Sequence, residues 1–134
     1  MRTFNIFVSH SWNYSYEYNR FVNLISNRQY FRFKNYSVPE ENPKSAKTYA
    51  ELKSALINQI KPTHIVIILS GMYVNHSDWI GIEMDIARYL KKPMIGIKPY
   101  GSQRIPTQVY NNVKKIVNWN TESIIEAIRR YALN

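Results

Sequence analysis

Short, continuous apolar runs alternate along this chain with segments in which apolar residues recur every three or four positions. Within 64–69 the run is Ile-Val-Ile-Ile-Leu, the most apolar in the sequence. Runs of this length are typical of strands that are buried on both faces of a sheet. Segments 3–9 and 93–97 carry similar runs, and 30–38 and 113–117 carry weaker ones. We therefore expect five strands, with 64–69 at the centre and the partly basic 30–38 at an edge.

Helical spacing of apolar residues fills most of the chain between these strands. It predicts helices over 14–26, 49–60, 78–90 and 121–133. Thr48 and Glu51 form a capping box at the start of the second helix. The third begins at Ser77 or Asp78, because a short side-chain oxygen can accept hydrogen bonds from the first helical turn. The remaining segments are expected to be connections without a regular helix: 39–46, 70–76 and 98–110.

Strands that alternate with helices indicate right-handed βαβ crossovers. We expect one domain over 1–134, an α/β three-layer sandwich of the flavodoxin-like type. Its five-stranded parallel sheet would have the order 2-1-3-4-5, with helices on both faces. Ligands of such sheets bind beyond the carboxyl ends of the strands, where the strand order reverses. Here that point lies between the first and third strands, which end near 9–12 and 70–72.

Composition narrows the chemistry further. The formal net charge is +9, but the basic residues are spread from Arg2 to Arg130 and form no long stripe. This distribution favours an anionic ligand over nucleic acid. The chain has no cysteine and only three scattered histidines, so we expect no disulfide and no metal site. It has no apolar run of membrane-span length and no signal-peptide pattern, so we expect a cytoplasmic protein without membrane contact.

Glu83 does not fit the apolar pattern of its helix. At about 100° per residue, Trp79, Ile86 and Leu90 fall within roughly 40° of one another, and Ala87 lies just beyond them. Glu83 falls between Leu90 and Ala87 on the same apolar face. A carboxylate on a buried stripe is costly unless it is paired. Two interpretations remain open: an edge residue or buried ion pair, or a carboxylate at the rim of a pocket. The second is favoured because the preceding connection starts at the end of the third strand, where ligands are expected to bind.

Other polar and aromatic residues are expected at the same edge of the sheet. Known phosphate-binding loops are missing, since no Gly-x-Gly-x-x-Gly follows the first strand and no Walker loop occurs. The acid cluster of a response-regulator receiver is missing too, because Ser9 and Ser70 stand at the two strand ends. Turn formation or capping is the alternative role for Ser9 and Ser11, and packing is the alternative role for Trp12 and Trp79. The candidate binding residues are Ser9, His10, Ser11, Trp12, Ser70 and Trp79.

The most specific motif of the chain is Ser77-x-Trp79-x-x-x-Glu83. Five other stretches accompany it: Phe7-Val8-Ser9-His10-Ser11, Tyr36-Ser37-Val38-Pro39, Ser70-Gly71-Met72-Tyr73, Pro93-Met94-Ile95-Gly96-Ile97 and Val117-Asn118-Trp119-Asn120-Thr121. Together they resemble the bacterial and archaeal TIR-like domains, in particular the group that includes the TIR component of Thoeris anti-phage systems. The resemblance covers nearly the whole chain.

The resemblance implies a flavodoxin-like fold and cleavage of the nicotinamide–ribose bond of NAD, which is a substrate rather than a cofactor. Glu83 matches the essential carboxylate of catalytic members. In Thoeris-type members the product is a cyclic or otherwise modified ADP-ribose that activates a partner effector protein. The loop 39–47 matches a segment that covers the site and takes part in self-association, so a homo-oligomer is expected.

The expected chemistry needs only one carboxylate. Nicotinamide leaves as a neutral base, so no general acid is required, and Glu83 would stabilise the positive charge on the ribose. Trp12 and Trp79 would shape the ring pocket, and 9–11 would meet the phosphates.

Two alternatives stay open. The first is a catalytically silent module that assembles through the loop 39–47 and exposed tyrosines such as Tyr14 and Tyr16. The second is a protein associated with nucleic acid, whose binding would fall steeply with salt.

Overall fold

The computed structural model describes residues 1–9, 16–37, 48–99 and 104–134, and for 72–77 it describes the backbone alone. The strands are β1 (Thr3–Val8), β2 (Arg32–Asn35), β3 (Ile65–Leu69), β4 (Met94–Ile97) and β5 (Lys115–Val117). The helices are α1 (Tyr16–Ser26), α2 (Tyr49–Ile60), α3 (Ser70–Tyr89), α4 (Thr107–Asn112) and α5 (Thr121–Tyr131).

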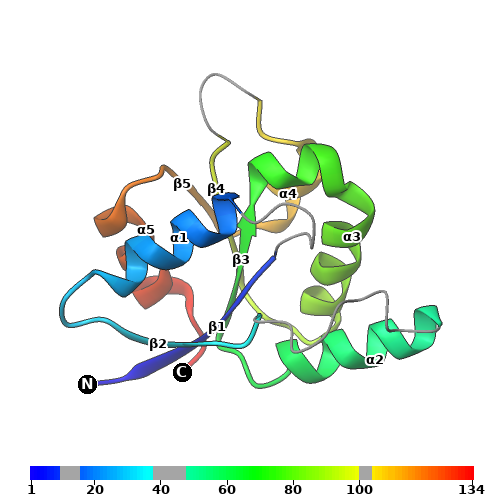
Figure 1. Ribbon diagram of the computed structural model, residues 1–134, viewed down its shortest axis with the longest axis horizontal. Helices are drawn as coiled ribbons and strands as arrows, with labels where there is room; N and C mark the ends of the chain where they lie inside the picture. The colour runs from blue at the N-terminus through cyan, green and yellow to red at the C-terminus, as the bar shows by residue number, and fades with distance from the viewer. Residues whose placement is uncertain (10–15, 38–47, 100–103) are drawn as a thin grey trace.

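The five strands form one parallel sheet in the order β2-β1-β3-β4-β5. Its register pairs Ile6 with Ile65 and Ile68 with Gly96. Helices α1 and α5 pack together on one face, while α2, α3 and α4 cover the other (Figure 1). The predicted three-layer, flavodoxin-like architecture and its strand order are therefore confirmed.

The core follows the apolar runs of the sequence. All five side chains of β3 are fully buried, because helices cover both faces of the central strand. Complete burial of one such side chain contributes about 1.5–3 kcal/mol relative to exposure. The strand that leads into α3 is thus the most firmly held part of the sheet. Among the described residues, no helix combines the length and the apolar character needed to cross a membrane.

Two expected connections are partly helical instead. Helix α3 begins at Ser70, directly after β3, rather than at Ser77 or Asp78. Leu69 stands at its N-cap position and offers no side-chain hydrogen bond. The prediction failed because Ser and Asp favour caps without being excluded from later helical positions. In Figure 1 the first turns of α3 lie across the top of the sheet, and the later turns run down beside it.

The second helical connection is α4, inside the segment 98–110 that was expected to lack a helix. Its six residues are too few to show a helical period in the sequence. Val109 anchors it by fitting against the bare backbone of Gly96 in β4. The predicted start of α2 is confirmed, since Thr48 Oγ1 accepts a hydrogen bond from the Glu51 N–H at 3.1 Å.

Candidate functional site

Glu83 lies on the buried face of α3. Only 1% of the residue is exposed, and Ile80, Met84 and Ala87 are buried around it at helical spacing. Trp79, one turn earlier, is only half-buried. The buried face of α3 is therefore centred closer to Glu83 than the helical spacing of apolar residues predicted, and Trp79 lies at its border. This follows from the packing of α3 against both β3 and α2, which the spacing alone could not specify.

The Glu83 carboxyl group has the Trp79 indole as a polar neighbour, but it has no ion-pair partner among the described residues. Its Oε1 atom is buried without a hydrogen bond, and neither of the two ion pairs among the described residues includes it. Burial raises the pKa of Glu83 well above its usual value, because desolvation penalises the charged form. The nearby Trp79 indole lowers this pKa in opposition, although its N–H forms no hydrogen bond of normal geometry. A carboxylate that reaches water at the helix edge is thus the wrong description of Glu83.

Ser9 and Ser70 follow adjacent strands at the same edge of the sheet. The Ser9 backbone N–H donates to the Ile67 carbonyl at 2.9 Å, which continues the pairing of β1 with β3. Ser70 is the first residue of α3. Both serines are fully buried, and neither Oγ has a partner among the described residues. The structure therefore places two unpaired hydroxyl groups where the strand order reverses.

A second acid, Glu17, also lies at this edge and was missed in the sequence. It is the second residue of α1, and its carboxylate packs against the backbone of Gly71 in α3. A Cβ atom at Gly71 would lie 2.7 Å from Glu17 Oε1, so only glycine leaves this space. Burial raises the pKa of Glu17, and its Oε2 atom is buried without a partner. The spacing of apolar residues did not single out Glu17, because acidic residues are common in the first turn of a helix.

Unpaired buried polar atoms gather around these elements. Leaving such a group without a hydrogen bond costs about 1–3 kcal/mol, so each one requires an explanation. Each of the five found among the described residues belongs to the end of β1, the start of α1, or α3: Ser9 Oγ, Glu17 Oε2, Ser70 Oγ, Trp79 Nε1 and Glu83 Oε1. A bound polar ligand would supply the missing partners. The βα units on either side of the strand-order reversal are therefore the candidate site.

Three predicted binding residues, His10, Ser11 and Trp12, lie outside the described residues, as does the whole loop 39–47. Their roles stay predictions. Within the part of the chain that the structure describes, no three His, Asp or Glu side chains lie close enough together to hold a metal ion.

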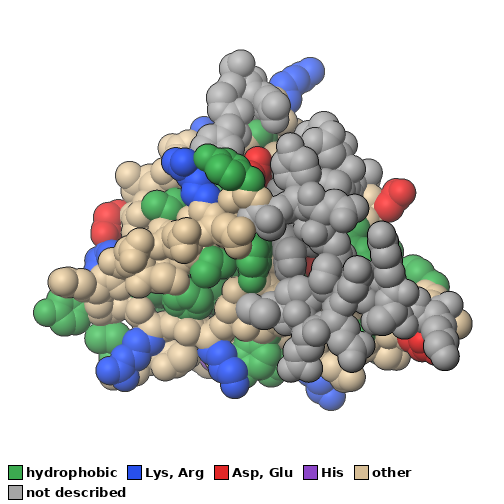
Figure 2. Space-filling model, in the orientation of Figure 1, with side chains coloured by type: hydrophobic (Ala, Val, Ile, Leu, Met, Phe, Trp, Pro, Cys, Tyr) green, Lys and Arg blue, Asp and Glu red, His purple; other side chains and the backbone are tan. Residues whose placement is uncertain are grey.

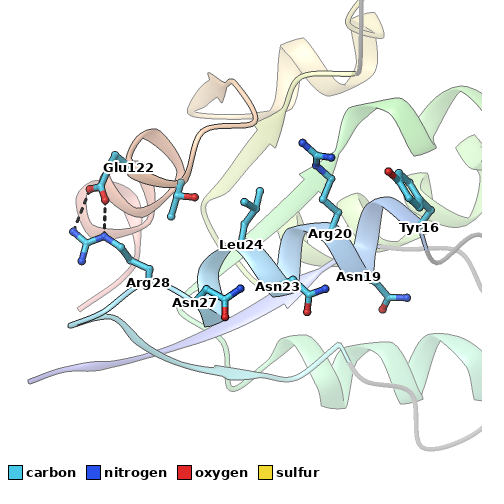
Figure 3. A pocket seen from close by; sticks show the side chains of 9 residues that line it. Tyr16, Asn19, Arg20, Asn23, Leu24, Asn27, Arg28 and Glu122 are labelled. Carbon is cyan, nitrogen blue, oxygen red and sulfur yellow. Dashed lines mark hydrogen bonds and ion pairs between the residues drawn. The ribbon is translucent and has the colours of Figure 1, made fainter.

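A groove lies elsewhere, along the exposed side of α1. It has a volume of about 660 Å³ and reaches the start of α5. Asn19, Asn23 and Asn27 project from α1 in one direction, and a pair of Arg28 with Glu122 closes the far end (Figure 3). None of the five unpaired polar atoms belongs to a residue that lines this groove. It is separate from the candidate site.

Comparison with known proteins identifies the family of this chain. A family model described as the TIR-like domain of the Thoeris protein ThsB matches residues 7–104, which is more than half of the chain. A comparison with curated proteins finds no match. The matched segment begins in β1, ends beyond β4 and contains all five residues with unpaired polar atoms. Because this model covers most of the sequence, the chain belongs to the ThsB TIR-like domain family of the Thoeris systems.

Proposed function

We propose that this protein cleaves the nicotinamide–ribose bond of NAD and that Glu83 is its catalytic carboxylate. The observation that carries the proposal is a fully buried carboxyl group whose Oε1 atom has no hydrogen bond and which forms no ion pair among the described residues. A purely structural acid at such a position would be expected to have a partner. Strongly perturbed carboxyl groups are also a common feature of catalytic sites.

The chemistry follows from the charge of the substrate. The nicotinamide ring of NAD is cationic, so the broken C1′–N bond leaves its electron pair on a neutral base and needs no general acid. Positive charge develops on the ribose at the same moment. An ionised Glu83 in a water-poor site would stabilise that charge strongly, because the surrounding dielectric is low. Water, or a hydroxyl group of the same molecule, then forms the new bond to C1′ and releases a proton.

The other unpaired groups suit the rest of the dinucleotide. The Trp79 side chain can pack beside the nicotinamide ring, as aromatic side chains commonly do with planar rings. The hydroxyls of Ser9 and Ser70, together with the N-terminal N–H groups of α3, can donate to the phosphates. His10, Ser11 and Trp12 are proposed to complete these contacts. NAD is thus the substrate, and no separate cofactor is proposed.

The biological output that we propose is an ADP-ribose-derived, cyclic signal made in the cytoplasm and read by a partner effector protein. The support for it is membership of the Thoeris family. Self-association through the loop 39–47 belongs to the same proposal.

The second candidate is a catalytically silent interaction module. Tyr16 favours it, because 67% of this tyrosine is exposed at the start of α1. Exposed tyrosines are common in protein interfaces. On the face shown in Figure 2, the described Lys and Arg side chains stand apart from one another around the edge, so they supply no continuous basic stripe there. This gives the nucleic-acid alternative no further support.

The deciding experiment is nicotinamide release from NAD by the purified protein, followed by chromatography. Glu83→Gln removes the charge at nearly constant volume. Asp85→Asn is the matched control, because Asp85 lies on the exposed side of the same helix and pairs with Arg88 there. We expect release by the wild type and Asp85→Asn, and a loss of at least ~100-fold in Glu83→Gln. Equal release by all three proteins would reject the role of Glu83.

The interaction module would be favoured if the wild type released no nicotinamide but associated with itself more strongly as its concentration rose. The same self-association would then be expected in Glu83→Gln. Sedimentation over a range of protein concentrations measures this self-association.

A further inference from the structure

Two carboxylates contact α3 at different points along its length. Glu17 reaches it from α1 at Gly71, near its first residue, whereas Glu83 belongs to α3 itself, twelve residues after Gly71. At a rise of about 1.5 Å per residue, these points are separated by up to about 18 Å along the helix. Such a separation suits two parts of one extended ligand better than two acids that act on the same atom.

The chemistry of Glu17 limits what it can bind. An ionised carboxylate only accepts hydrogen bonds, and it repels phosphate. Glu17 Oε2 is buried without a partner, and neither ion pair among the described residues contains Glu17. Burial raises the pKa of Glu17, so a ligand donor at Oε2 would compensate for the lost hydration. The group that Glu17 receives must therefore be a hydroxyl or an amino group.

Gly71 indicates that this carboxylate is held in a defined position. The three atoms nearest to an ideal Cβ at Gly71 all belong to the Glu17 carboxyl group, at 2.7–3.3 Å. Glu17 Oε1 thus presses against the α3 backbone, while Oε2 is the oxygen left without a bond. This places one free acceptor at the sheet edge that also carries the Ser9 and Ser70 hydroxyls.

A dinucleotide contains two ribose rings joined through its phosphates. We propose that Glu17 binds a hydroxyl group of the second ribose, the one that does not carry nicotinamide. The inference rests on the proposed function, which assigns the first ribose to Glu83. In other doubly wound α/β folds, an acidic side chain binds a ribose hydroxyl in the same way. Glu17 then acts as a binding residue and a specificity determinant, remote from the bond that breaks.

The test compares two substrates that share the cleavable bond. NAD has both riboses, whereas nicotinamide mononucleotide has only the one attached to nicotinamide. For Glu17→Gln we expect kcat/KM for NAD to fall about 10- to 100-fold, mainly through KM, because a hydrogen bond to a charged group is lost. The kcat/KM of Glu17→Gln for nicotinamide mononucleotide should change less than about twofold. The control is Glu126→Gln, because Glu126 is an exposed acid on α5, and its kcat/KM for each of the two substrates should also change less than about twofold.

Discrimination between NAD and NADP provides a second test. NADP carries a phosphate on the second ribose, which would lie close to the Glu17 carboxylate. The wild type should prefer NAD to NADP, and Glu17→Gln should reduce that preference, since the repulsion is removed. An unchanged preference, or an equal fall for NAD and nicotinamide mononucleotide, would overturn the proposal. Thermal unfolding of each variant shows whether an equal fall reflects a damaged fold.

Binding separates this inference from the proposed function. Calorimetry with NAD in the Glu83→Gln background measures affinity without turnover. If the wild type released no nicotinamide, cleavage would be rejected, yet a 10- to 100-fold weaker binding of NAD on adding Glu17→Gln would still support the role of Glu17. If NAD bound equally well with and without Glu17→Gln, or did not bind at all, the assignment of Glu17 would be wrong.

Discussion

Gly71 and Glu17 are in direct contact across two helices, and the contact exists because glycine has no side chain. The Glu17 carboxylate occupies the space that a Cβ atom at position 71 would need, with Oε1 2.7 Å from that point. Helix α3 has no side-chain cap of its own, since Leu69 stands at its N-cap position. A carboxylate beside its first turn is favourable, because the start of a helix carries partial positive charge.

Gly71→Ala should therefore move Glu17 with little loss of stability. The clashing atoms are the far end of a flexible side chain, and alanine favours a helix by up to about 1 kcal/mol over glycine. We expect a free energy of unfolding within about 1 kcal/mol of the wild type, but an affinity for NAD that is reduced as in Glu17→Gln. Chemical denaturation and calorimetry measure the two quantities. Unchanged NAD affinity in Gly71→Ala would argue that the position of Glu17 is unimportant.

Two other glycines should respond in opposite directions to the same substitution. A Cβ at Gly96 in β4 would lie 2.8 Å from Ile116 Cδ1 and 3.2 Å from Val109 Cγ1, so Gly96→Ala should lower the free energy of unfolding by about 1–3 kcal/mol. A Cβ at Gly81 in α3 would meet nothing within 4 Å, so Gly81→Ala should raise it by up to about 1 kcal/mol. Urea denaturation of both variants checks this, and a gain in stability for Gly96→Ala would show that the sheet repacks easily.

Glu83 should make stability depend on pH. Its pKa is raised in the native state above the ordinary value of 4.5, so between these two pKa values the folded protein binds more protons than the unfolded chain. Stability contributed by the protonated form is then present below about pH 4.5 and is lost as the pH rises through the native pKa. The loss amounts to about 1.4 kcal/mol for each pH unit between the two values.

A glutamine side chain does not ionise, so the Glu83→Gln variant should not lose stability in this way as the pH rises. Relative to the wild type, its free energy of unfolding should increase from about pH 4.5 upward and level off above the native pKa of Glu83. Denaturation series at several pH values measure the difference, and Asp85→Asn reports the effect of removing an exposed carboxylate from the same helix. Parallel pH profiles for wild type and Glu83→Gln would contradict the burial of a charged group at this position.

The proposed NAD-cleaving activity should rise with pH. The proposed mechanism requires an ionised Glu83, and its raised pKa means that this form becomes abundant only above the ordinary range of a glutamate. We expect kcat/KM to increase as the pH passes through the native pKa of Glu83, because this parameter reports ionisation of the free enzyme. Initial rates of nicotinamide release across about pH 5 to about pH 8 provide the measurement. Activity that falls over this interval would indicate an essential protonated acid instead.

The arrangement of elements in this chain was largely readable from its pattern. The apolar runs at 65–69 and 94–97 identified strands that helices cover on both faces, and their alternation with helical spacing led to the correct strand order. The start of α3 was not readable, because cap preferences rank residue types and do not forbid them elsewhere. The short α4 is held by tertiary contacts that no local pattern contains, among them Val109 against Gly96 and the hydrogen bond from Arg88 to Asn112.

For the site, the sequence alone determined that a carboxylate at position 83 interrupts an apolar helix face and that two strands end in serine. Only the tertiary structure decided that Glu83 is fully buried with its Oε1 atom left without a hydrogen bond, and that Glu17 shares the same sheet edge. The physical reason is that periodicity reports which face of an element is apolar, whereas desolvation and unpaired hydrogen-bonding groups depend on what the neighbouring elements place against that face. Glu17 and Gly71 are 54 positions apart, and their contact arises only when α1 and α3 meet.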